Sequence, residues 1–125
     1  LPPIVGSWEH LKSVWLNLII NARDAVNQLP QNRQISITTR LDTEKEHVQV
    51  IVQDNGKGMS EAELAHIFEP FYTTKDPGKG TGLGLATCHR IIEQHGGEIN
   101  VVSAPNEGAT FIIRLPVNRN GNSNT

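Results

Sequence analysis

The chain has 125 residues, of which 37% are hydrophobic, so it can bury one core and is expected to form one domain. Its formal net charge of -2 gives no basic footprint for nucleic acid, and its single cysteine excludes an internal disulfide and a cysteine-based zinc site. No stretch approaches the roughly 20 apolar residues that span a membrane. Because the chain begins at Leu1 without an initiator methionine, we interpret it as a domain excised from a longer protein, and we expect a reducing, cytoplasmic compartment.

An amphipathic helix is the first predicted element, because apolar residues recur at steps of three and four from Trp8 to Leu29, where Pro30 ends the pattern. Two strands follow, with the alternating sequences QISITTRL and HVQVIVQD, which end at Leu41 and Asp54. The charged run between these strands predicts a hairpin loop.

A second, short helix is predicted to begin at the capping box SEAE, which starts at Ser60, and to end at Pro70. The aperiodic segment from Phe71 to Gly80 predicts a loop long enough to act as a lid. A third helix follows the glycines of this loop and is expected to end at Gly96, which suits a C-terminal cap.

Two further strands, EINVVS and GATFIIRLPV, complete the predicted elements, with a turn before Gly108 joining them. About three helices on one face of a mixed, mostly antiparallel sheet form an α+β fold, a two-layer α/β sandwich. We expect residues 1–117 to form this domain and the polar residues 118–125 to be a disordered tail.

The sequence GKGTGLGL places glycines at every second position from Gly78 to Gly84, immediately before the third helix. Glycines at a helix start let an anion approach backbone N–H groups, so phosphate is the expected ligand, with a flexible linker as the alternative. The segment matches neither the Walker phosphate loop nor the dinucleotide fingerprint. A nucleotide would therefore be bound here by another architecture.

Polar residues form a stripe beside the apolar face of the first helix: Asn17, Asn21, Asp24 and Gln28. A solvated helix face explains such a stripe, but asparagine is a poor helix former, and its carboxamide oxygen suits Mg²⁺. The sequence DNGKGM, which begins at Asp54, is either an ordinary turn or a pocket in which the carboxylate accepts a hydrogen bond from an amine.

Other reactive side chains give weaker signals. Lys75 lies in the expected lid, where it is either a solvated charge or a contact for phosphate. None of the five histidines has the spacing of a metal site or a neighbouring nucleophile, and Cys88 falls on the apolar stripe of the third helix, which favours a place in the core.

Five motifs occur in one order along the chain: NLIINARDA, DNGKGM, FEPFYTTK, GKGTGLGL and GATF. This series resembles the N, G1, F, G2 and G3 boxes of the ATP-binding catalytic domain of sensor histidine kinases, in the GHKL ATPase superfamily with its Bergerat-type fold. The resemblance covers the chain from about Leu11 to Leu115.

The resemblance assigns roles to residues of the first helix and the G1 box. It implies that Asn21 is the Mg²⁺ ligand and that Asn17 contacts the phosphates one turn earlier. It also implies that Asp54 reads the adenine amino group, with Gly56 and Gly58 lining the base pocket.

The remaining implied site residues lie in the lid and the last strand. Tyr72 and Lys75 would cover the ribose and phosphates, which makes Lys75, with Asn17 and Asn21, an expected catalytic residue. Thr110 would support the adenine pocket. The phosphate-facing turn would consist of Gly80, Gly82, Leu83 and Gly84.

By the same resemblance, the domain is a protein histidine kinase module that binds Mg-ATP and donates the γ-phosphate to a histidine. None of the histidines present lies in a His-Glu-Leu-x-x-Pro context, so the acceptor is expected on a separate dimerisation hairpin of the parent protein. A response regulator would be an indirect partner. We expect the isolated domain to be monomeric, without nucleic-acid or direct membrane contact, and the parent to be a homodimer.

Two other functions use the same boxes. A gyrase-type or chaperone-type hydrolase should carry a glutamate one turn before the metal asparagine, where this chain has Asn17. A regulatory module that binds nucleotide without transferring phosphate would keep the same boxes and is not distinguished by sequence.

Overall fold

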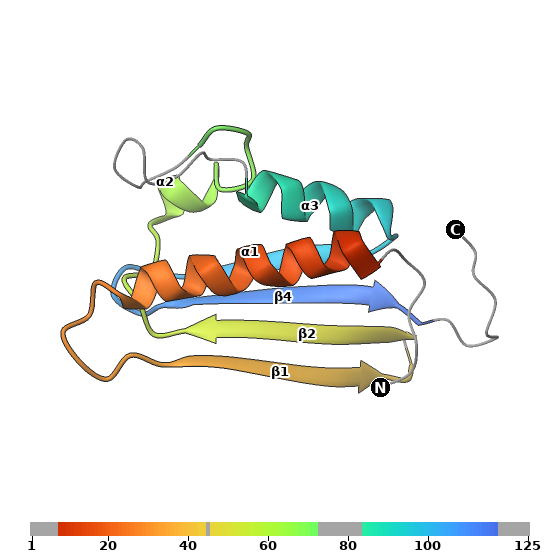
Figure 1. Ribbon diagram of the computed structural model, residues 1–125, viewed down its shortest axis with the longest axis horizontal. Helices are drawn as coiled ribbons and strands as arrows, with labels where there is room; N and C mark the ends of the chain where they lie inside the picture. The colour runs from red at the N-terminus through yellow and green to blue at the C-terminus, as the bar shows by residue number, and fades with distance from the viewer. Residues whose placement is uncertain (1–7, 45, 73–83, 118–125) are drawn as a thin grey trace.

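The structure is a computed structural model that describes residues 8–44, 46–72 and 84–117. Its elements, in chain order, are α1 (Trp8–Val26), β1 (Ile35–Asp42), β2 (His47–Asp54), α2 (Glu61–Leu64), α3 (Gly84–Gln94), β3 (Glu98–Ser103) and β4 (Ala109–Pro116). The four described strands form one antiparallel sheet in the order β1-β2-β4-β3, and the helices lie on one face of it (Figure 1). The predicted two-layer sandwich is therefore confirmed.

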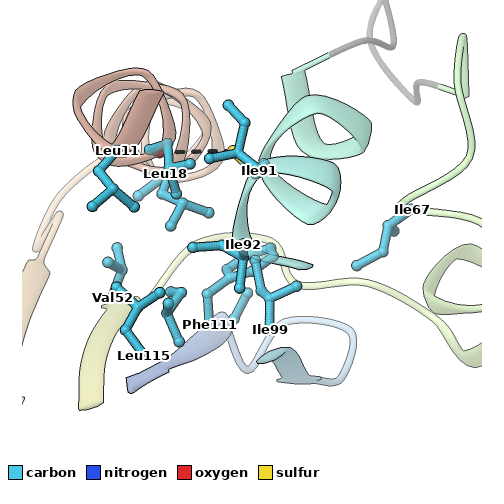
Figure 2. Packing of buried hydrophobic residues seen from close by; sticks show 14 residues of the cluster. Leu11, Leu18, Val52, Ile67, Ile91, Ile92, Ile99, Phe111 and Leu115 are labelled. Atoms are coloured by element: carbon cyan, nitrogen blue, oxygen red, sulfur yellow. Dashed lines mark hydrogen bonds between the residues drawn. The ribbon is translucent and has the colours of Figure 1, made fainter. Parts of the chain in front are cut away.

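The core lies between the sheet and the two longer helices. Figure 2 shows Ile92 of α3 next to Phe111 of the sheet, and Ile91 between α3 and α1. Strand β4 supplies every second residue to this core, as expected for a strand with one buried face. Cys88 is fully buried in the same cluster, as predicted, and burial raises the pKa of its thiol to about 12.

The helix ends follow local capping rules. Ser60 accepts a hydrogen bond from the backbone of Glu63, whose side chain accepts one from the backbone of Ser60, so the predicted capping box begins α2. After α3, the chain turns at Gly96, which has a φ of +73°. The Gly96 and Gly97 N–H groups donate back to the last turn of the helix, in the pattern of a Schellman motif.

Strand β1 differs from the other strands because its inward face is largely uncovered. Ile35, Ile37 and Leu41 alternate as the sequence indicates, yet each is at least 39% exposed. The two long helices pack mainly against each other and against the remaining strands, and α1 makes only a few contacts with this edge strand. Periodicity alone predicts which side chains share a face, but not whether another element covers them.

Two further observations bear on the sequence predictions. Among the described residues, no helix is long and apolar enough to cross a membrane. The expected lid and the 118–125 tail lie outside the described residues, except for Phe71 and Tyr72 at the start of the lid.

Candidate functional site

A pocket opens between the C-terminal half of α1 and the loop that follows β2. Residues of the N and G1 motifs, which are far apart in the sequence, meet in it because α1 packs against β2. Its lining residues are Asn21, Asp24, Ala25, Gln28, Asp54, Lys57, Gly58, Met59 and Ala109.

Asp54 is the one buried charged or polar residue within the described part of the chain, with 5% of its surface exposed. Its Oδ1 accepts a hydrogen bond from the Gly56 N–H at 2.8 Å, and the carboxylate also accepts one from the backbone of Ala109. Burial raises the pKa of the Asp54 carboxyl, and these two hydrogen bonds partly offset the rise. The motif is thus an Asx turn, which agrees with the ordinary turn that the sequence allowed. This turn also places a carboxylate on the core face of the sheet.

Glycines of the G1 motif let three backbone segments approach closely. A Cβ on Gly58, whose φ is +68°, would lie 1.9 Å from the Ala104 carbonyl oxygen. A Cβ on Gly56 would lie 2.6 Å from the backbone of Ala25 in α1. Gly58 lines the pocket, whereas Gly56 is buried against the helix and is not among the lining residues.

The two asparagines of α1 face different neighbours. Asn21 lines the pocket. One turn earlier, the Asn17 carboxamide donates from Nδ2 to the Ser13 carbonyl at 2.9 Å, and its Oδ1 faces the first residue of α3, 3.2 Å from where a Cβ on Gly84 would lie. The Asn17 side chain therefore points from α1 toward Gly84, the last glycine of the glycine-rich segment.

Tyr72 marks the start of the expected lid. It packs against the hydrophobic core, and its ring lies 5.6 Å from the ring of His66, which in turn contacts Glu69 through Nδ1 at 2.5 Å. The other predicted lid and turn residues, Lys75, Gly80, Gly82 and Leu83, lie outside the described residues.

Thr110 is expected to support the pocket and is not among the residues that line it. Asp54 pairs with Ala109 across β2 and β4, and Gln53 pairs with Thr110. Because paired residues share a face and neighbours alternate, Ala109 points toward the pocket and Thr110 points to the opposite face of the sheet. The supporting role of Thr110 therefore stays a prediction, and Ala109 is the residue of this strand that lines the pocket.

Several pocket and supporting residues were not predicted. Lys57 and Met59 stand in the G1 motif, and Ala109 was identifiable only from the strand register. Asn55 donates from Nδ2 to the Asn32 carbonyl at 2.6 Å and accepts from the Gln34 N–H at 2.9 Å, which ties the loop after α1 to the end of β2. Its long-range partners leave no signal in a single sequence.

Two side chains that line the pocket, the Asn21 carboxamide and the Asp24 carboxylate, lie one helix turn apart. Both carry oxygen atoms that can coordinate a metal ion. Such a donor set fits a hard cation that keeps several waters, as Mg²⁺ does.

Comparison with known proteins agrees with this geometry. Residues 6–119 match the family model described as "Histidine kinase-, DNA gyrase B-, and HSP90-like ATPase". The chain is 41% identical over 120 residues to sporulation kinase E of Bacillus subtilis, and 44% identical over 118 residues to the sensor histidine kinase ZraS of Escherichia coli K12. These matches cover 96% and 94% of the chain, but only 15% and 24% of the relatives. The chain thus spans about a quarter or less of these curated relatives.

Solved structures show the same fold. The mycobacterial sensor histidine kinase MprB superposes with a TM-score of 0.77 at 26% identity, covering 91% of this chain and 74% of that one. Full-length ShkA, solved in complex with AMPPNP, superposes with a TM-score of 0.79 at 29% identity, covering 94% of this chain and 23% of that one.

Replacing Asp54 by Asn should flatten the pH dependence of stability, because an amide does not titrate. The folded-state pKa of Asp54 is raised, so the stability that its protonated form contributes is present below the unfolded-state pKa and is lost as pH rises through the folded-state pKa. Asparagine avoids this loss, so the melting temperature of the variant relative to that of the wild type should rise from pH 4 to pH 8. Thermal unfolding of both proteins between pH 4 and 8 measures it; a destabilisation that is equal at every pH would contradict the desolvation argument.

Proposed function

This chain belongs to the histidine kinase-, DNA gyrase B- and HSP90-like ATPase family, and on that basis we propose that it binds Mg-ATP and presents the γ-phosphate to a histidine on a separate helical hairpin of its parent protein. The domain comprises residues up to 117. A response regulator would receive the phosphate from that histidine. The similarity to sensor histidine kinases over nearly the whole chain supports this choice within the family.

The buried Asp54 carboxylate carries the proposal. Two backbone N–H groups hold it in place, and a carboxylate with two oxygens keeps further acceptor capacity for a ligand. An exocyclic amino group is a donor of the right kind, and its hydrogen bond would favour the ionised form that burial disfavours. Guanine has a carbonyl at the corresponding ring position. A carbonyl oxygen and a carboxylate oxygen both accept hydrogen bonds, so guanine would form no hydrogen bond with Asp54 there.

The phosphate end of the nucleotide is assigned to the side of the pocket that α1 forms. Asn21 would hold Mg²⁺, with Asp24 beside it in the same wall. Asn17 would contact the phosphates near Gly84, where the N-terminus of α3 favours negative charge. When bound, Mg²⁺ neutralises phosphate charge. The family resemblance implies that Tyr72, Lys75, Gly80, Gly82 and Leu83 would also contact the nucleotide.

Transfer by such a module is a matter of positioning and charge neutralisation. Asn17 occupies the helix position at which a related hydrolase would need a carboxylate to activate water, and its carboxamide donates to Ser13. An amide cannot act as that general base. This favours donation of phosphate to a separate side chain over hydrolysis by this chain.

Calorimetric titration tests the nucleotide pocket. Wild-type protein should bind Mg-ATP and bind Mg-GTP much more weakly, and Asp54→Asn should lower ATP affinity by about 1–3 kcal/mol because a donor on the base loses its charged acceptor. Asp42→Asn, a change in the edge strand β1 outside the pocket, is the matched control and should bind as the wild type does. Unchanged ATP affinity in Asp54→Asn would refute the adenine-reading role.

Label transfer tests the donor role. With γ-labelled ATP, the isolated chain should acquire no acid-labile label, whereas the parent's helical hairpin added in trans should become labelled slowly, because the tether that raises effective concentration is absent. Asn21→Ala should keep the fold and abolish this transfer.

Three outcomes of the transfer experiment would contradict the proposal. Stable label on the isolated chain would overturn its role as a donor only. Native transfer by Asn21→Ala would exclude Asn21 as the metal ligand. Tight ATP binding with no label on a matched hairpin would favour a regulatory module instead.

A further inference from the structure

Ser103, the last residue of β3, forms a bridge that the five family motifs do not contain. Its hydroxyl oxygen accepts a hydrogen bond from the Met59 N–H at 2.9 Å, and the hydroxyl donates to the Gly108 carbonyl at 2.6 Å. Met59 belongs to the loop after β2, and Gly108 immediately precedes β4. One half-buried hydroxyl thus joins the two segments that build the wall of the pocket opposite α1.

The Gly108 carbonyl belongs to the same peptide unit as the Ala109 N–H, and that N–H donates to the Asp54 carboxylate. The peptide plane is therefore held at both ends, by Ser103 at its oxygen and by Asp54 at its nitrogen. A hydrogen bond to the oxygen also polarises the N–H and strengthens its bond to the carboxylate. Ser103 acts on Asp54 through one rigid unit.

Close packing transmits any shift of this unit to the pocket. A Cβ on Gly108, whose φ is +73°, would lie 2.0 Å from the Asp54 carbonyl oxygen. A Cβ on Gly58 would lie 3.1 Å from the Gly108 carbonyl oxygen, the acceptor of the Ser103 hydroxyl. The backbones of the two segments are in contact, so the direction of the Gly108 carbonyl and the placement of Asp54 change together.

We propose that Ser103 is a positioning residue for base recognition, which fixes the Gly108–Ala109 peptide unit so that Asp54 meets the exocyclic amino group of adenine. This inference rests on the proposed function, because it assumes that the ligand of the pocket is ATP. Ser103 does not line the pocket and touches the base only through the groups that it holds.

Removing the hydroxyl should alter selectivity more than overall binding. Ser103→Ala leaves the Met59 N–H without its acceptor and the Gly108 carbonyl without its donor, so the peptide unit is free to turn and the Asp54 carboxylate loses its fixed direction. The other charged residues of the pocket, Asp24 on α1 and Lys57 in the loop, are unchanged by this substitution. The phosphate contacts proposed for Asn17 and Asn21 lie on a different element.

The experiment compares ATP with purine riboside triphosphate, which lacks only the amino group, by titration calorimetry on the intact chain. Wild-type protein should prefer ATP, and Ser103→Ala should reduce that preference about tenfold. Ser103→Thr keeps a hydroxyl and should retain the preference. Ser36→Ala, an exposed serine on β1, is the matched control and should change neither affinity.

The outcomes separate this inference from the proposed function. Equal losses for both nucleotides in Ser103→Ala would show that Ser103 only supports the fold and would overturn the inference. Failure of the wild type to bind ATP would instead contradict the proposed function. If Ser103→Ala does not fold, Ser103→Thr and Ser103→Val carry the same comparison: the preference must survive in Thr and fall in Val.

Discussion

The structure depends on one costly feature, an ionisable carboxylate held on the core face of a β-sheet. Asp54 continues the inward alternation of β2, where an apolar residue would serve the fold better. Two backbone N–H groups make its burial tolerable, and each must come close to the carboxylate. The glycines at positions 56, 58 and 108 follow from that need, since a side chain at any of them would collide with a neighbouring backbone. The pocket is the space that remains beside this cluster once α1 has packed over the sheet.

Helix α1 serves the core and the pocket with two adjacent stripes. Leu18 and Ala22 on the apolar stripe are almost fully buried, and Asn21 and Asp24 on the polar stripe border the pocket. The C-terminal end of the helix is held by distant partners, because Asn55 binds the loop that follows it. Packing that stabilises the fold therefore also sets the distance between the residues proposed to meet metal and base.

Local rules predicted most of the fold. The alternation in HVQVIVQD and EINVVS predicted β2 and β3 with the bounds that the structure has, and the capping box at Ser60 predicted the start of α2. These signals depend only on residues close to one another in the sequence. Long-range register was not accessible in the same way. Only the pairing of β2 with β4 shows that Ala109, and not its neighbour Thr110, lies on the same face as Asp54. The bridging role of Ser103 was not predicted either, because its partner Met59 lies 44 positions away in sequence. The exposure of the apolar side chains of β1 depends on how far the helices extend across the sheet. The alternation of apolar residues in the sequence does not predict that extent.

Nuclear magnetic resonance of the ¹⁵N-labelled chain tests most directly whether the Asp54 cluster receives the base. The amide signals of Gly56 and Ala109 report the two hydrogen bonds that hold the carboxylate. Mg-ATP should shift both signals in a saturable manner, and Mg-GTP at the same concentration should leave them nearly unchanged. Saturable binding of ATP with shifts confined to other parts of the chain, and with Gly56 and Ala109 unmoved, would contradict the assignment of this pocket to adenine.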